Sequence, residues 1–294
     1  MITDLINTLA EFTAYLFPFE CMDAMFMQRA MLALLLIAPL TAISGIQVVN
    51  ARMSFFSDAI GHSAFAGVAL GLLGGISLNL SMPLTAVLVG LLIMFLHRSS
   101  RLSSDTVIGV IFSAVAAAGL AIISRDRAAA GNIQMFLFGD ILTITPEQIG
   151  GMGLLLILFL LFQLFAFNKL LLIGVNPMLA SVHRVKVRLY QYLFALLLAL
   201  VVISSVRAAG VILVTALLVV PAAAARNIAS TARSQFFLTL GIGYFSCVSG
   251  LILAAQEKIN IPAGSAIVLI AVLIFFLSLA VNLLKPKRKS DSAL

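Results

Sequence analysis

The chain has 294 residues, of which 62% are hydrophobic and only 10% are charged. This composition excludes a water-soluble fold, because too few polar side chains are present to cover its surface. The formal net charge is +7, but the basic residues lie between apolar runs and at the C-terminus rather than on one amphipathic surface. A nucleic-acid partner is therefore not expected, and the lipid bilayer is the natural solvent.

Residues 1–24 precede the long apolar runs. Asp4 and Glu11 interrupt this segment, and it has no basic start leading to a small-residue cleavage site, so it does not read as a signal peptide. Residues 5–19 are too short for a span and predict an amphipathic helix at the membrane interface. The two cysteines, Cys21 and Cys247, have no CxxC spacing and indicate neither a disulfide framework nor a thiolate metal site.

Nine apolar runs then follow, each long enough to approach the thickness of a bilayer as a helix. They predict an all-α, polytopic membrane protein with about eight or nine transmembrane helices in one bundle, formed by residues 25–284. The alternating ten-residue segments of a β-barrel are absent. The runs lie near residues 25–49, 56–78, 82–96, 106–124, 147–167, 189–206, 209–225, 235–255 and 264–284.

The basic residues indicate an orientation. If the Lys/Arg-rich tail, residues 285–294, is cytoplasmic, thirteen of the Lys and Arg residues fall on the cytoplasmic side and five on the other. This asymmetry predicts an external N-terminus and a cytoplasmic C-terminus.

Two regions do not fit a simple series of spans. The mixed segment between Arg125 and Gln148 is too short and too charged to cross, and it predicts an external reentrant or surface helix. The connection from Ser204 to Gly210 is so short that the flanking runs form either a helical hairpin or one broken helix. Irregular backbone at that depth is stable only inside protein or beside water.

Asp58 and His62 are the strongest candidates for chemistry. They are four residues apart and therefore lie on one face of the second span. Ionisable side chains inside a membrane are costly and usually functional, and imidazole with carboxylate suits zinc, manganese or iron. A helix beginning near Ser57 would instead leave Asp58 at the membrane surface, where it complements the helix N-terminus.

A stripe of small residues follows the same helix at intervals of four. Such a small-xxx-small pattern lets a second helix approach closely where lipid offers no hydrophobic drive, so it predicts helix packing. Gly71→Leu is expected to disrupt assembly. The stripe consists of Ser63, Gly67, Gly71 and Gly75.

The loop between residues 168 and 188 carries a helix-start signal. Asn176 precedes Pro177, and proline is favoured at the first helical position. This predicts a short cytoplasmic helix on the membrane surface, the alternative being an ordinary basic loop. The residues concerned are Asn176, Pro177, Met178, Leu179, Ala180, Ser181, Val182, His183 and Arg184.

Two further positions are candidates for the path of an ion. Asp140 lies outside on this topology and could attract cations at an entrance, or it could belong to a solvated loop. Pro221 ends or kinks the seventh span, where missing backbone bonds could permit gating or merely give a static kink. The chain has no GxxxxGK[ST] motif, so any ATPase is a separate partner.

Five blocks of the sequence, taken in order, resemble the permease subunits of bacterial zinc/manganese/iron ABC importers, most closely the zinc-uptake branch. Together they extend over most of the chain, and several blocks in the same order are more specific than a single motif. The blocks are residues 52–71, 105–124, 137–148, 209–231 and 261–265.

The resemblance implies a homodimeric permease of the bacterial inner membrane that pairs with two cytoplasmic ATPase subunits and an external metal-binding delivery protein. The transported ion would be Zn²⁺ first and Mn²⁺ next, with no permanently bound cofactor and no enzymatic activity. The resemblance also implies that Asp58 and His62 lie on the path of the metal ion and that residues 177–187 form the helix that docks on the ATPase. There the chain departs from the family, with Asn176 for an acidic residue and Arg184 for a glycine.

Three other functions fit the composition. An ion-coupled secondary metal transporter would need a second acid inside the membrane, and the predicted spans offer almost none. A permease for metal chelates would not need the Asp58–His62 pair. A membrane scaffold would transport nothing.

Overall fold

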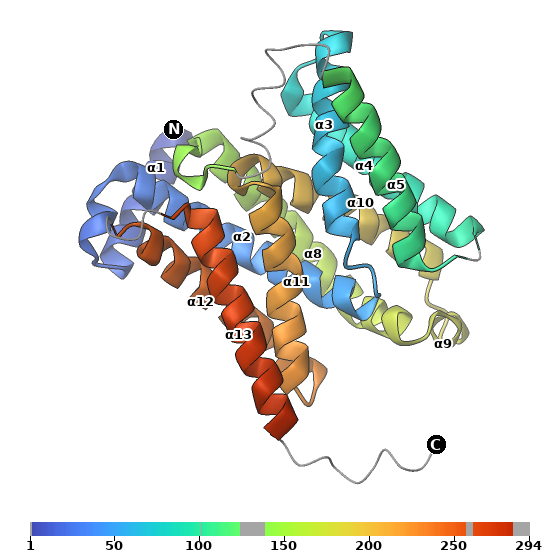
Figure 1. The fold of residues 1–294 in the computed structure, drawn as a ribbon. Coiled ribbons are helices and arrows are strands. Elements are labelled where there is room, and N and C mark those ends of the chain that lie inside the picture. The colour runs from blue at the N-terminus through green and yellow to red at the C-terminus, as the bar shows by residue number, and fades with distance from the viewer. Residues whose placement is uncertain (1, 101, 124–138, 257–260, 285–294) are drawn as a thin grey trace.

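Helices form the regular structure of the chain. The computed structural model describes residues 2–100, 102–123, 139–256 and 261–284, and in this part nine helices are long and apolar enough to cross a membrane (Figure 1). Their number confirms the nine predicted spans. They are α2 (Met25–Asn50), α3 (Phe56–Gly74), α4 (Leu78–Ser99), α5 (Ser104–Ile123), α8 (Pro146–Val175), α10 (Val187–Ala209), α11 (Val211–Ile228), α12 (Ala232–Ala254) and α13 (Ala263–Leu284).

α8 is longer than the predicted span at residues 147–167. The polar residues Asn168 and Lys169 suggested an end, but the helix continues to Val175. Lys169 does not break it, because its Nζ donates a hydrogen bond of 2.6 Å to the hydroxyl of Tyr190 on α10 and lies 4.8 Å from the centre of that ring. Asn168 and Lys169 therefore lie inside a continuous helix, and the loop that follows α8 is shorter than expected.

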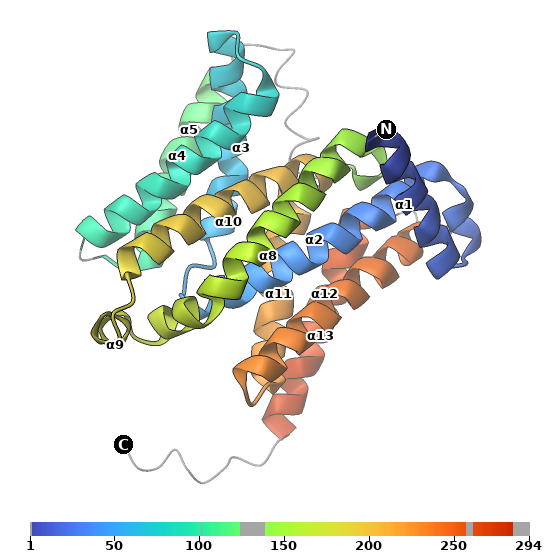
Figure 2. The same cartoon turned by 180° about the vertical axis from the view of Figure 1, so that it is seen from behind.

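The helices form two groups around α2. α3, α4 and α5 pack on one another, as do α11, α12 and α13, while α2 contacts α8, α11 and α12. α10 joins the two groups through its contacts with α4 in the first and α11 in the second, and it also contacts α8 (Figures 1 and 2). α2 is almost wholly buried along its C-terminal half, and it supplies the centre of the core with residues such as Leu40 and Ile46.

The N-terminal segment contains α1 (Ile2–Leu16) and a short 3-10 helix, η1 (Glu20–Asp23). Ile6, Ala10 and Thr13 are buried against the bundle, whereas one outward stripe of α1 is apolar and exposed. Its placement at the membrane interface stays a prediction, and the exposed stripe suits a lipid contact. The stripe consists of Leu5, Leu9, Phe12 and Leu16.

α10 and α11 meet at a single residue, Gly210. Its φ of 84° and ψ of 159° are a conformation that glycine adopts readily, and the two helices diverge sharply from it (Figure 2). Gly139, with a φ of 63°, packs directly on this break, because a Cβ at Gly139 would collide with the backbone of Ala209 and Gly210. The break is thus enclosed by protein, as irregular backbone in a membrane requires.

The predicted external segment between Arg125 and Gln148 lies mostly outside the described residues. Its described part runs from Gly139 through the 3-10 helix η2 (Ile141–Thr143) to a capping box at the start of α8. There Thr145 Oγ1 accepts from the backbone N–H of Gln148, and the Gln148 side chain accepts from the Thr145 N–H.

Candidate functional site

Asp58 and His62 lie one turn apart at the start of α3. The helix begins at Phe56, so Asp58 occupies its first turn, close to the shallow arrangement considered from the sequence. Both side chains are partly exposed, whereas the neighbouring Ala59, Ile60 and Gly61 are buried. The pair therefore marks a polar strip at the edge of an otherwise buried helix.

A second helix, α11, runs alongside this strip. A Cβ at Gly61 would lie 2.8 Å from Val211 Cγ1, which shows how closely the two helices approach. One turn further along α11, Thr215 lies beside the Asp58 carboxylate, while its hydroxyl donates a hydrogen bond of 3.4 Å to the carbonyl of Ile212 in its own helix. A hydroxyl-bearing residue of another helix is thus the neighbour of the Asp58 side chain.

Aromatic rings from α3 and α5 fix the imidazole of His62. Its ring centre is 5.6 Å from that of Phe65 and 4.9 Å from that of Phe112, the latter in an edge-to-face arrangement. Thr215 and Phe112 were not predicted as site residues. The only sequence signal for Thr215 is a hydroxyl in an apolar run, and Phe112 gives none.

One copy of the chain supplies an incomplete metal site. Among the described residues, no group of three or more His, Cys, Asp or Glu side chains could hold a metal ion. Asp58 and His62 therefore offer one carboxylate and one imidazole, which suit a transition metal that must leave again. Further ligands would come from water or from a second copy.

The small-residue stripe of α3 faces α4. A Cβ at Gly67 would lie 2.8 Å from Met82 Cα, and one at Gly71 would lie 2.6 Å from Ser81 Oγ. Ser63 is fully buried and its hydroxyl donates to the carbonyl of Ile60. The prediction that Gly75 belongs to the packing stripe was wrong, because a Cβ there would meet nothing within 4 Å. With a φ of 62°, Gly75 instead forms the C-terminal cap of α3.

The short helix after α8 is present as α9 (Pro177–Val182). Asn176 Oδ1 accepts hydrogen bonds from the backbone N–H groups of Met178 and Leu179, at 2.9 and 3.2 Å. Beyond the helix, Arg184 has a φ of 59°, and the N–H groups of Arg184 and Val185 donate to the carbonyls of Ser181 and Ala180. This is a Schellman motif, in which glycine is the usual left-handed residue.

One face of α9 is apolar and exposed. Met178 and Val182, four residues apart, are 80% and 77% exposed, while Ala180 is buried. Basic side chains follow directly, at Arg184, Lys186 and Arg188. An exposed apolar face on a short, polar-flanked helix is typical of a surface that binds another protein.

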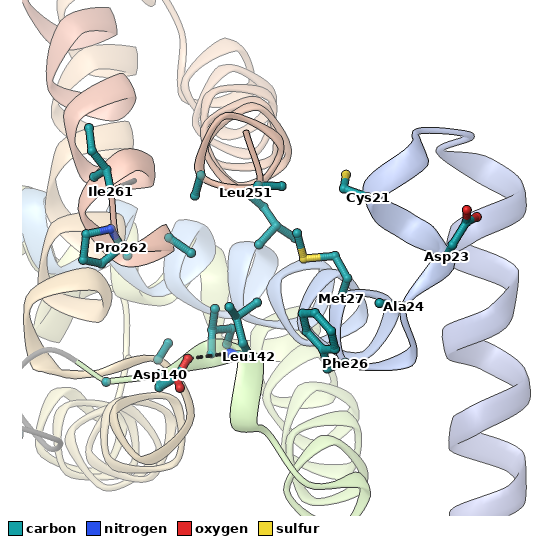
Figure 3. Close-up of a pocket in the computed structure, with 17 residues that line it drawn as sticks. Cys21, Asp23, Ala24, Phe26, Met27, Asp140, Leu142, Leu251, Ile261 and Pro262 are labelled. Carbon is teal, nitrogen blue, oxygen red and sulfur yellow. Dashed lines mark hydrogen bonds between the residues drawn. The ribbon is translucent and has the colours of Figure 1, made fainter. Parts of the chain in front are cut away.

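Asp140 lies at the edge of a cavity of about 680 Å³ (Figure 3). The cavity is lined by the start of α2, the end of α12 and the start of α13, which lie far from α9 (Figures 1 and 2). Its carboxylate accepts a hydrogen bond of 3.1 Å from the N–H of Leu142. Cys21 and Asp23 lie at the other edge, so the acidic and thiol groups do not converge on one point. The cavity is an opening next to the α10–α11 break, and the entrance role of Asp140 stays a prediction.

Pro221 lies inside α11, which continues past it to Ile228. It therefore does not end the helix, contrary to one of the two sequence expectations. Gly45 of α2 packs against the backbone carbonyl of Leu218 and the methyl group of Ala222 next to this proline. The gating role of Pro221 stays a prediction.

Comparison with known proteins assigns the chain to a family. Residues 23–282 match the family described as the ABC 3 transport family. The chain belongs to this family. This confirms the predicted resemblance to ABC permeases and the assignment as a multi-pass transport permease, while the expected order of zinc before manganese stays a prediction.

Two curated relatives cover nearly all of this length. The manganese import system permease protein ScaB of Streptococcus gordonii is 32% identical over 87% of this chain and 91% of its own. The high-affinity zinc uptake system membrane protein ZnuB of Haemophilus influenzae is 28% identical over 85% of this chain and 95% of its own.

A solved structure shows the same fold. The matching chain belongs to PsaBC from Streptococcus pneumoniae in complex with Fab. The TM-score is 0.74 at 29% identity, over 92% of this chain and 94% of that chain. The helix arrangement of this chain is therefore also found in that chain of PsaBC.

Proposed function

We propose that this chain is the membrane-spanning permease of an ATP-driven importer for zinc or manganese in the bacterial cytoplasmic membrane. The observation that carries the proposal is the partly exposed Asp58–His62 pair, with Thr215 beside it, on transmembrane helices. Relatives of nearly the same length are named for manganese import and for zinc uptake. The metal ion is the transported substrate and not a resident cofactor.

A homodimer would complete the path. Partly exposed ionisable side chains on a lipid-embedded helix need water or protein next to them. Two copies that face each other across this part of α3 and α11 would bring two carboxylates and two imidazoles together. Four ligands of these types form a common zinc site and also accept manganese.

The energy source would be a pair of cytoplasmic ATPase subunits that dock on α9. The exposed Met178 and Val182 supply an apolar contact, and the cap at Asn176 fixes the direction of the helix. ATP-driven movement of α9 would pass to α8 and α10, which flank it in the chain. An external delivery protein would release the ion on the opposite side, where the Asp140 cavity lies.

The experiment that tests the proposal is uptake of radiolabelled zinc and manganese into vesicles that contain the permease and its ATPase. Asp58→Ala and His62→Ala are each expected to reduce uptake at least about ten-fold, because loss of a metal-orienting group has effects of that size. Asp105→Asn is the matched control, since Asp105 also lies in the first turn of a helix on the same side, α5. Unchanged uptake in both Ala variants would remove the proposed metal contacts.

An ion-coupled secondary transporter is the competing function. It predicts uptake that follows an ion gradient and does not need ATP hydrolysis. Full uptake with a catalytically inactive ATPase would overturn the ATP-driven importer and favour this alternative.

A further inference from the structure

A groove of about 620 Å³ lies between α8 and α12, in the half of the membrane nearer to α9. Its floor is Ile43 of α2, and α8 and α12 form the two walls. The edge-to-face contact of Phe167 and Phe236, at 5.7 Å between ring centres, joins the walls across it. Leu164 lines the groove and is 78% exposed, so in a membrane helix it faces lipid.

The groove lies on the face of the molecule away from the polar strip formed by Asp58 and His62. α8, α2 and α12 are in front in Figure 2, whereas α3, α5 and α11 are in front in Figure 1. A second copy that covers Asp58 and Thr215 would therefore leave the groove open to the bilayer.

Three polar residues, Gln163, Asn168 and Arg233, line this mostly apolar groove. Gln163 is only 5% exposed, and neither its Oε1 nor its Nε2 has a hydrogen-bond partner among the described residues. A buried amide without partners costs free energy, so it indicates a ligand that supplies them. At the cytoplasmic end, Arg233 lies in the first turn of α12, where the positive end of the helix dipole also favours a negative charge, and Thr231 Oγ1 caps the N–H of Ser234.

We propose that the groove binds one anionic phospholipid. Its phosphate contacts Arg233 and the N-terminus of α12, and an acyl chain runs along the apolar wall past Leu164. The Gln163 amide donates to an ester carbonyl of the same lipid. Gln163 is about 6 Å deeper along α8 than Phe167, and Phe167 meets Phe236, which is itself about 6 Å inside the start of α12, so the phosphate and ester contacts lie about two helix turns apart along the groove.

Charge complementarity selects an anionic lipid over a neutral one. Basic residues between transmembrane helices on the cytoplasmic side bind anionic headgroups. The assignment to the cytoplasmic leaflet rests on the proposed orientation, whereas binding itself requires only that the helices span a membrane. Failure of metal uptake would therefore leave this site untouched.

The test uses a fluorescent reporter, because the chain contains no tryptophan. Leu164→Trp places a single tryptophan in the groove of the full-length protein. Phe165→Trp is the matched control, since Phe165 is the next residue, is 76% exposed and does not line the groove. Both variants are reconstituted in phosphatidylcholine vesicles with bromine-labelled phosphatidylglycerol or bromine-labelled phosphatidylcholine as quencher.

Quenching at Leu164→Trp is expected to show an affinity for phosphatidylglycerol about five-fold above that for phosphatidylcholine, and quenching at Phe165→Trp no preference. Adding Arg233→Gln should abolish the preference, whereas Arg233→Lys should keep it. Arg233 is exposed, so these variants are expected to fold. Equal lipid affinities at both reporters, or a preference that survives Arg233→Gln, would overturn the proposal.

The Gln163 contact has its own test. Ester-linked phosphatidylglycerol should bind at the Leu164→Trp reporter about five-fold more tightly than its ether-linked form, because the ether lacks the carbonyl acceptor. Gln163→Leu should remove this difference. Equal binding of the two lipids to the protein with Gln163 intact would disprove the contact.

Discussion

The short helix α9 and the first turns of α3 both have a proposed function, but different kinds of contact determine their structures. The form of α9 depends on residues within ten positions of one another, from the Asn176 cap to the left-handed Arg184. The Asp58–His62 strip depends on α11 and α5, through Thr215 and Phe112. A substitution in α9 can therefore change that helix without changing the rest of the bundle. A substitution in the Asp58–His62 strip also changes its contacts with α5 and α11.

This difference predicts how far a substitution acts. A change in α9 should alter docking or local order and leave the bundle intact. A change in the packing of α3 should affect the whole α3–α4–α5 group, because each of these helices is held by the others.

Gly67→Leu should have the largest effect. The added side chain meets the backbone of α4 at Met82, which cannot move without shifting that helix. Overpacking of this kind costs about 3 kcal/mol or more, so we expect little folded protein in the membrane, measured by thermal unfolding and size-exclusion profile. Gly241→Leu on α12 is the control, since a Cβ there meets nothing within 4 Å. Equal stability of the two variants would contradict the assigned packing.

Val182→Lys tests the local region. It places a charge in the exposed apolar face of α9, and loss of a central interface contact weakens association about 30-fold. Lys near a helix C-terminus stabilises the helix, so unfolding of α9 would not explain the loss. Co-purification of the ATPase is the measurement, and Val182→Thr, with nearly the same shape, is the control. If the Lys variant binds the ATPase normally, this face of α9 is not the docking surface.

Thr215→Val tests the strip shared between helices. The change keeps the shape and removes the hydroxyl beside Asp58, so the apparent affinity for zinc or manganese should fall about ten-fold. Thr85→Val on α4 is the control, because the Thr85 hydroxyl bonds only to the carbonyl of Ser81 in its own helix. An equal effect of the two substitutions on uptake would show that Thr215 does not act on the metal path.

The same difference explains what the sequence could predict. The nine spans follow from apolar composition, and the start of α9 follows from Asn176 and Pro177, because these signals are local. The partners of Asp58 and His62, and the groove floored by Ile43, depend on helices distant in the chain. The continuation of α8 past Lys169 was missed for the same reason, since the Tyr190 partner that accommodates this charge lies on α10.

Arg184→Gly should have the smallest effect and the most local one. A left-handed conformation costs an L-residue about 1–2 kcal/mol, and glycine avoids this cost but loses roughly 0.5–1 kcal/mol more backbone entropy on folding. The balance favours glycine by somewhat under 1 kcal/mol, so amide hydrogen exchange across α9 should slow about three-fold. Arg184→Ala separates backbone from charge, because alanine removes the charge and keeps the Cβ. If the Ala variant slows exchange as much as the Gly variant, the gain comes from lost charge repulsion and not from the backbone. If only the Gly variant does so, the left-handed conformation of Arg184 costs local stability at the docking helix.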